Sequence, residues 1–428
     1  MAAIGQRTDL AESPEHRGQE IMPSALRLIL LILAVAPLVY YLLSIYCVVG
    51  YFRAQRKEKP RRPQATPPAS ILKPVRGMDL EAYENFASYC RLDYPEYEMV
   101  FAVADPDDPA IPVIKKLQRD FPDRVIRLVT NVPHLGANRK TNNLCQLVRE
   151  AKYDLVVMAD SDVRVESDYL QDVAAPFEDP KVGAVTAFRR IVGGANLAVY
   201  LDQLECADSA ASGLVARRLE GKMQFAFGWT MATTKKHLTE IGGWEAMVDY
   251  HSDDFELGNR IARHGYRVEL MRRPVWVVSP RETLDEFLKH ELRWSIGLRN
   301  VRPVAYVGMI FTHGLPWAMV GALAAPSRHI AMAYLLAYLV LRLGMAWTAG
   351  VRGLGDTTMA ERLWLLPLRD ALNFAIWTAG LFLDKIVWRG LVYRVRKGRL
   401  VPEADVMQQT RPHRVADIDQ PEFSYHGE

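Results

Sequence analysis

Residues 154–165 have the sequence Asp154-Leu-Val-Val-Met-Ala-Asp160-Ser161-Asp162-Val-Arg-Val165. An apolar run flanked by charge is typical of a central strand in a parallel sheet that is covered on both faces. Side chains just beyond the carboxyl end of such a strand lie where open α/β sheets bind ligands. Asp160 and Asp162 would repel each other there, which predicts a divalent cation bound with substrate phosphates. The alternative is that this triplet only forms a turn or caps a helix.

Short apolar runs alternate with amphipathic segments on the N-terminal side of this stretch. Expected strands lie at 69–74, 97–104 and 125–129, and expected helices lie at 80–90, 111–121 and 142–151. Strands and helices that alternate at this spacing predict βαβ units. The predicted fold class is therefore α/β, with a Rossmann-like, mainly parallel sheet.

An uncharged apolar segment precedes this pattern. Residues 28–50 carry no charged side chain, and the run is long enough to cross a bilayer. The alternative is a signal peptide, whose apolar core is shorter, about 7–15 residues, and ends in a small-residue cleavage site. The length of the run favours an uncleaved anchor at 27–51. Six Lys and Arg residues between Arg53 and Arg62 follow it, so the positive-inside rule predicts that the next domain is cytoplasmic.

Three further apolar runs occupy the C-terminal part of the chain, at 304–325, 330–349 and 371–383. A basic stretch at 388–399 follows them and is expected on the cytoplasmic side. An anchor plus three full crossings would put this stretch outside, so one run is predicted to be interfacial or re-entrant. The sequence leaves open which run that is. We therefore expect a multi-pass integral membrane protein.

The composition narrows the possible partners. The net charge of the 428 residues is only +3, which argues against nucleic acid as a partner. The basic residues concentrate beside the apolar segments, where anionic membrane lipids explain them better. The four cysteines are scattered, which argues against a zinc cluster or a disulfide framework and agrees with a reducing compartment.

Three more polar features accompany the Asp160 stretch. Asp105 follows the second expected strand, and Asp253-Asp254 precedes an expected helix at 255–264. His290-Glu-Leu-Arg293-Trp294 falls in an expected helix at 283–298, just ahead of the C-terminal apolar runs. Each feature has an ordinary explanation, as a helix cap or as an amphipathic helix. Their occurrence together favours an active site beside a membrane.

These features resemble the inverting, processive-type glycosyltransferases with a GT-A fold, whose signature is Asp, Asp-x-Asp, Asp and Gln/Arg-x-x-Arg-Trp. Within them the chain is most similar to the ceramide glucosyltransferase family over roughly residues 69–400. The motifs that carry the resemblance are Ile71-Leu-Lys73-Pro-Val-Arg-Gly77, Leu92-Asp-Tyr-Pro95, Asp107-Asp-Pro-Ala-Ile111, Gly136-Ala-Asn138-Arg139-Lys140-Thr-Asn-Asn-Leu144, Tyr153-Asp-Leu155, Asp160 to Val165 and Trp388-Arg-Gly-Leu-Val-Tyr-Arg394. One departure is His290, which stands where Gln or Arg is usual. This variant resembles bacterial hopanoid-associated members, so the lipid acceptor stays open.

The resemblance implies roles for individual residues. Asp105 would contact the uracil or ribose of a UDP-sugar, and Asp160 and Asp162 would hold the ribose and a Mg²⁺ or Mn²⁺ ion on the diphosphate. Asp254 would be the general base for the acceptor hydroxyl. The remaining expected site residues are Lys73, Arg139 and Asp253 for the donor, and His290, Arg293 and Trp294 near the diphosphate and the acceptor. Asn138, Arg139 and Lys140 together could help hold phosphate or sugar hydroxyls, although a solvated basic loop is an equally good interpretation. Asp253 is the alternative base.

The composition of the chain predicts a domain order, in which the resemblance implies the GT-A assignment. The expected segments are a tail at 1–26, the anchor at 27–51, a basic Pro-rich linker at 52–68, a GT-A domain at 69–303, membrane segments at 304–388 and a basic stretch with a tail at 389–428.

The expected reaction is the transfer of a hexose from a UDP-sugar to a lipid, with UDP-glucose and ceramide favoured. Such a reaction needs the diphosphate charge neutralised and a carboxylate within reach of the incoming hydroxyl. A single base without a protein nucleophile predicts one inverting displacement. The alternatives are transfer of N-acetylglucosamine to a hopanoid or other lipid, polysaccharide synthesis, and a non-catalytic membrane scaffold.

Overall fold

The computed structural model describes residues 23–57, 65–279, 283–388 and 390–403. Most of the expected N-terminal tail, the last part of the basic cluster at 53–62 and the C-terminal tail lie outside the described residues.

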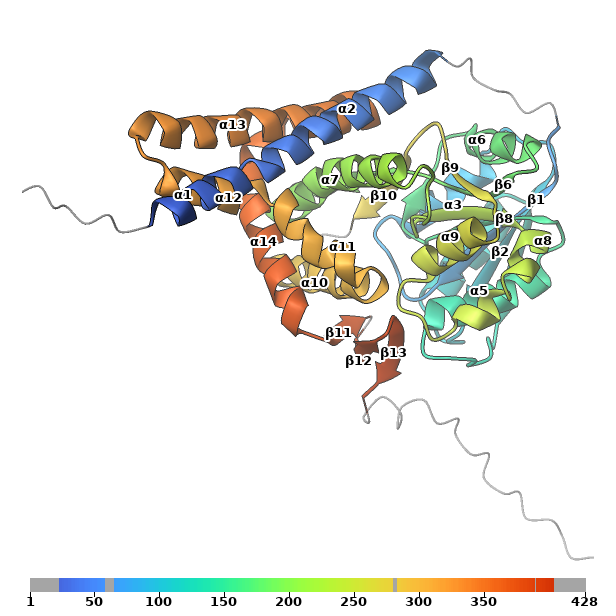
Figure 1. Cartoon of the computed structure of the whole chain (residues 1–428). Coiled ribbons are helices and arrows are strands. Elements are labelled where there is room, and N and C mark those ends of the chain that lie inside the picture. Colours follow the sequence, from blue (N-terminus) through green and yellow to red (C-terminus); the bar gives the residue numbers. More distant parts are fainter. Residues whose placement is uncertain (1–22, 58–64, 280–282, 389, 404–428) are drawn as a thin grey trace, which may run out of the picture.

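A seven-stranded sheet forms the centre of the larger domain (Figure 1), with the strand order β3-β2-β1-β4-β8-β6-β9. Its strands are β1 (Ala69–Val75), β2 (Tyr97–Val103), β3 (Val125–Thr130), β4 (Leu155–Ala159), β6 (Val182–Thr186), β8 (Thr230–Thr234) and β9 (Arg267–Leu270). The pairs β3-β2, β2-β1, β1-β4 and β6-β9 are parallel, whereas β8 runs antiparallel to both of its neighbours. The expectation of an α/β fold with a mainly parallel sheet is confirmed.

Both faces of this sheet are covered by helices. Successive side chains of a strand point to opposite faces, so the strands contribute apolar side chains to a core on each side. On one side Ile71 and Val75 join a core that includes residues of α3 (Ala82–Cys90) and α4 (Ala110–Asp120). On the other side Leu72 joins a core with residues of α5 (Arg139–Glu150) and α9 (Asp253–Arg263). All of β4 is buried, as predicted for a central strand.

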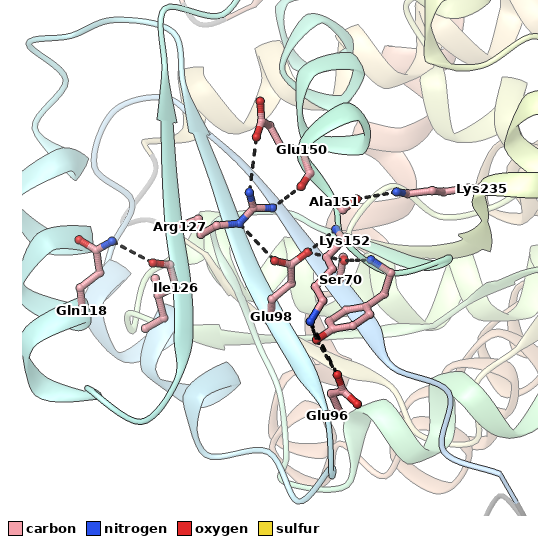
Figure 2. Close-up of polar contacts among 11 residues, drawn as sticks. Ser70, Glu96, Glu98, Gln118, Ile126, Arg127, Glu150, Ala151, Lys152 and Lys235 are labelled. Atoms are coloured by element: carbon pink, nitrogen blue, oxygen red, sulfur yellow. Dashed lines mark hydrogen bonds and ion pairs between the residues drawn. The ribbon is translucent and has the colours of Figure 1, made fainter.

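A buried carboxylate ties the starts of several strands together (Figure 2). Glu98 of β2 accepts hydrogen bonds from Ser70 Oγ and from the Lys152 backbone N–H, each at 2.6 Å, and pairs with Arg127 Nε of β3 at 3.2 Å. This network lies at the amino ends of β1 and β2. The acidic residues predicted for the site lie at the opposite, carboxyl ends of the strands.

A long helix, α7 (Leu197–Leu219), connects the sheet domain with the apolar helices and packs against α2 (Ala36–Lys57) (Figure 1). Close to it lies a second sheet, formed by β5 (Val163–Arg164), β10 (Val275–Ser279) and β7 (Arg189–Gly193).

Two helical segments in the described residues are long and apolar enough to cross a membrane. One combines α1 (Ser24–Leu33) with α2, and the other combines α13 (Arg328–Ala346) with the π-helical segment η4 (Trp347–Leu354). Residues 303–312, comprising α11 (Pro303–Gly308) and η3 (Met309–Thr312), meet α12 (Gly314–Ala324) at a bend of 51°. This pair is a broken span or a re-entrant loop. The third run forms α14 (Leu366–Phe382).

Part of the basic C-terminal stretch forms a third sheet of β11 (Lys385–Trp388), β12 (Leu391–Arg396) and β13 (Arg399–Pro402). Its apolar side chains pack on Ile296 of α10 (Leu284–Val301). The backbone N–H groups of His251 and Leu400 donate across to Gly398 and Asp249, at 2.8 and 2.7 Å. This sheet therefore lies against the loop that precedes α9.

Candidate active site

Acidic residues gather at the carboxyl ends of β2 and β4. Asp105 follows β2, is exposed, and accepts the backbone N–H of Asp107 at 3.0 Å. Asp160 and Asp162 follow β4, and both side chains are partly exposed. Because β1 lies between β2 and β4 in a parallel arrangement, these carboxylates share one edge of the sheet.

Asp160 is held from behind by a buried lysine. Lys73 Nζ donates to the backbone carbonyl of Asp160 at 2.9 Å and lies 3.6 Å from the ring centre of Tyr89. Burial lowers the pKa of Lys73 to about 7, although the carboxylates of Asp160 and Asp162 favour its charged form. The Lys73 side chain is fully buried and supports the Asp160 backbone, and its predicted role in donor binding stays a prediction.

A second lysine joins two of the acidic positions. Lys140 Nζ lies 2.6 Å from Asp160 Oδ1 and 3.8 Å from Asp253 Oδ2, and it donates to the Gly228 carbonyl at 3.2 Å. Burial disfavours the charge, yet Asp160, Asp253 and Asp254 outweigh this effect and raise the pKa of Lys140 above its usual value. Lys140 is therefore a fixed cation within the site.

The start of α5 explains why Lys140 rather than Arg139 lies between the carboxylates. The Asn138 side chain caps the helix by accepting the Thr141 N–H at 3.1 Å, and it donates to the Tyr250 carbonyl at 2.8 Å. Neighbouring residues on a helix point about 100° apart. Arg139 consequently points elsewhere and hydrogen-bonds Tyr393 of β12.

Asp253 and Asp254 form the first turn of α9 and differ in environment. Asp253 is buried, and burial raises the pKa of its carboxyl group while Lys140 lowers it. Asp254 is partly exposed, and its Oδ1 accepts the Phe255 N–H at 2.8 Å. Burial of the carboxyl group and repulsion by Asp253 raise the pKa of Asp254 to about 6. A Cβ atom added at Gly228 would lie 3.1 Å from Asp254 Oδ2, so a larger residue there would crowd this carboxylate.

The His290 to Trp294 motif lies on α10, which begins with a capping box formed by Thr283 and Glu286. His290 meets the Trp294 ring edge-on, with ring centres 4.4 Å apart. Arg293 points toward the third sheet, and its guanidinium lies 5.5 Å from the Trp388 ring centre. The motif therefore presents two sides, one with His290 and Trp294 and the other with Arg293.

Comparison with known proteins identifies the family. Residues 29–401 match the profile of glycosyl transferase family 21. The chain belongs to this family. The resemblance to ceramide glucosyltransferases is thereby confirmed, whereas the similarity of the His290 variant to hopanoid-associated members stays a prediction.

Individual relatives of this family 21 glycosyltransferase include ceramide glucosyltransferase 3 of Caenorhabditis elegans, 26% identical over 264 residues, which are 59% of this chain and 55% of the relative. The ceramide glucosyltransferase of Komagataella phaffii is 31% identical over 148 residues, covering 32% of this chain and 29% of the relative. The poly-beta-1,6-N-acetyl-D-glucosamine synthase of Staphylococcus epidermidis is 24% identical over 278 residues, which cover 60% of this chain and 63% of the relative. The chain spans about half the length of the C. elegans relatives that it matches.

Among solved structures, a mannosyltransferase of Pyrobaculum calidifontis in complex with GDP-Man and Mn²⁺ aligns with a TM-score of 0.48 at 18% identity, over 82% of this chain and 99% of that chain.

The family 21 site has oxygen ligands suited to a divalent metal. Asp160 and Asp162 offer hard carboxylate oxygens, and the Asp160 side chain is 34% exposed. Among the described residues no group of three or more His, Cys, Asp or Glu side chains could hold a metal ion. Mg²⁺ usually takes only one or two carboxylates and completes its shell with phosphate oxygens and water. Two carboxylates therefore fit a metal that binds together with the nucleotide.

The structure adds residues that the sequence reasoning did not select. One is the buried His251, whose pKa is lowered to about 3 by burial and by the charge of Arg293. Arg189 of β7 is a second, because its guanidinium lies 4.8 Å from the Trp294 ring centre. The signal for Arg189 was present as a charged pair, Arg189-Arg190, within an otherwise strand-like run.

Proposed function

We propose that this family 21 glycosyltransferase is a multi-pass membrane enzyme that moves a hexose from a UDP-sugar to the hydroxyl group of a lipid. UDP-glucose and ceramide are the first candidates, a choice supported by the ceramide glucosyltransferases among its relatives. The observation that carries the proposal is the partly exposed Asp254 carboxylate, with the charges of Lys140 and Asp160 close by at the edge of the sheet.

The donor half of the proposed site consists of Asp105, Asp160 and Asp162. Asp160 and Asp162 would hold Mg²⁺ or Mn²⁺, which when bound supplies positive charge to the diphosphate. In this proposal Lys140 and Arg293 supply further positive charge to the diphosphate from the protein itself. Preorganised charge of this kind stabilises the leaving group, since negative charge grows on the diphosphate as the glycosidic bond breaks.

The acceptor half centres on Asp254. Its carboxylate takes the proton of the acceptor hydroxyl while that oxygen bonds to the anomeric carbon and the bond to the UDP oxygen breaks. One displacement of this kind inverts the configuration at the anomeric carbon. Asp253 is less suited to the role, because it is buried and its charge is balanced by Lys140.

The placement of α10 supports a lipid acceptor. Glu291, within the motif, pairs with Arg369 of the apolar helix α14 at 2.6 Å. The helix that carries His290 and Trp294 is thus anchored to the apolar part of the protein, where a lipid head group would arrive. The last turn of α2 carries Arg56 and Lys57, which supports a cytoplasmic catalytic domain.

Each of two alternative functions is supported by one observation. The His290 variant of the motif, which resembles hopanoid-associated members, favours transfer of N-acetylglucosamine to a hopanoid or another lipid. The similarity to the S. epidermidis synthase favours polysaccharide synthesis. A synthase needs several long spans around a channel, whereas the described residues contain two candidate spans, or three if the bent pair counts as one.

The test is to incubate membranes that contain the protein with radiolabelled UDP-glucose, UDP-N-acetylglucosamine or UDP-galactose and with ceramide, a hopanoid or diacylglycerol. We expect label in an organic-soluble glycolipid, with UDP-glucose and ceramide as the best pair, and transfer by an Asp254→Asn variant lowered on the order of 10²–10⁴-fold. Label in an insoluble polymer would support the synthase alternative instead. Absence of product from every pair would reject the proposal.

A further inference from the structure

An acidic face of α7 holds one arginine in the interior. Arg189 Nη2 lies 2.9 Å from Asp202 Oδ1 and 2.7 Å from Glu205 Oε2, and the Arg189 side chain is only 5% exposed. Buried charge is costly unless it is paired and hydrogen-bonded. Two carboxylates on successive turns of one helix pair with the same Nη2 atom, whereas the buried Arg189 Nε has no hydrogen-bond partner among the described residues.

The Arg189 guanidinium also lies between two indole rings. Its carbon is 4.9 Å from the ring centre of Trp229 and 4.8 Å from that of Trp294. A guanidinium is planar, always charged and able to stack on aromatic faces, which an ammonium group cannot do in the same way. Arginine therefore joins the two rings in a way that lysine would not reproduce.

Both indoles belong to segments that form the site. The Trp229 carbonyl accepts the backbone N–H of Asp160 at 3.2 Å, and the Trp229 Nε1–H donates to the Ala187 carbonyl at 2.6 Å. Trp294 follows Arg293 on α10, and His290 packs edge-on against its ring. The stack thus connects the segment that supports a donor carboxylate with the helix proposed for the acceptor.

We propose that Arg189 is a positioning residue for sugar transfer and that it acts through Trp294. Asp202 and Glu205 hold the Nη2 end of the guanidinium, and the guanidinium packs against Trp294 and holds its indole beside the acceptor. The inference rests on the proposed function, because that function gives Trp294 its place near the acceptor. Misplacement of a group by about 1 Å can reduce turnover by up to about 100-fold.

The neighbouring residue Arg190 provides a matched control. Its guanidinium lies 5.0 Å from the ring centre of a different tryptophan, Trp276, and its Nε donates to the Leu354 carbonyl. Arg189→Lys and Arg190→Lys are therefore the same change, in the same strand, each next to an indole. Only the first change alters the contact with Trp294.

The activity arm uses the full-length protein with UDP-glucose and ceramide. We expect Arg189→Lys to lower kcat on the order of 10- to 100-fold with the KM for UDP-glucose within a few-fold, and Arg190→Lys to leave both near the parent values. In a double variant, Arg189→Lys should add little to the loss caused by Trp294→Phe. Glu205→Gln, which leaves the Asp202 pair in place, should give a smaller loss of kcat. Equal activity of the Arg189→Lys and Arg190→Lys variants would overturn the proposal.

A second arm does not depend on the acceptor. The difference in intrinsic fluorescence between each protein and its Trp294→Phe derivative isolates the signal of Trp294. Acrylamide should quench this signal more strongly in the Arg189→Lys protein than in the parent or in the Arg190→Lys protein. Unchanged quenching would show that the indole does not depend on Arg189 and would overturn the inference. Changed quenching without transfer to any lipid would count against the proposed function alone.

Discussion

Lys140 Nζ lies 2.6 Å from Asp160 Oδ1. The first carboxylate of the Asp160-Ser161-Asp162 motif is therefore already paired with a cation of the chain itself. The same ammonium group reaches toward Asp253 and favours the ionised form of Asp254. One lysine thus links the expected donor and acceptor halves of the site.

Replacing Lys140 should change the pH dependence of transfer. Asp254 must be ionised to accept a proton, and its pKa is about 6, so kcat should fall as the pH drops through about 6. Lys140 lowers this pKa, so Lys140→Met should move the acid limb of the pH–rate profile to higher pH. Lys140→Arg keeps the charge and should keep the limb near its original position. A Lys140→Met profile that coincides with that of the parent would contradict the assignment.

Asp254→Asn should lower glycosyl transfer on the order of 10²–10⁴-fold, the usual contribution of general acid–base catalysis. The amide keeps the size of the carboxylate but cannot take the proton. UDP-sugar binding, measured by calorimetry, should stay within a few-fold. Asp253→Asn is the matched comparison at saturating donor, and an inactive Asp253→Asn beside a mildly affected Asp254→Asn would reverse the two roles.

Transfer should require Mg²⁺ or Mn²⁺. Two adjacent carboxylates repel the phosphate groups of the donor unless a cation lies between them. Excess EDTA should abolish turnover and added Mg²⁺ should restore it. Asp162→Asn should raise the metal concentration needed for half-maximal rate, and full turnover in EDTA or an unchanged metal titration of the variant would refute the ligand assignment.

The catalytic domain should face the cytoplasm. The four native cysteines are buried, so a single cysteine placed at the exposed position Glu178 gives a clean label site. A membrane-impermeant maleimide should not react with it in intact cells and should react after permeabilisation. Ready labelling of intact cells would invert the proposed topology.

Local patterns in the chain were sufficient for the strands β1 to β4 and the helices between them. The apolar run at 155–159 and the carboxylates that end it are contiguous, so their meaning does not depend on distant residues. The apolar stretches were equally visible, because crossing a bilayer is a matter of length and charge. The positions of Asp105 and Asp160 directly after strands were likewise visible in the sequence.

Pairings between distant segments needed the tertiary structure. The antiparallel direction of β8 depends on which neighbours accept its hydrogen bonds, and no local pattern encodes that choice. Lys140 rather than Arg139 enters the site because the Asn138 cap fixes the rotation of α5. The bend between η3 and α12 breaks an apolar run that reads as continuous in the sequence. Arg189 stacks on Trp294 only because β7, α7 and α10 pack together, and a contact among three separate segments leaves no periodic signal in any one of them.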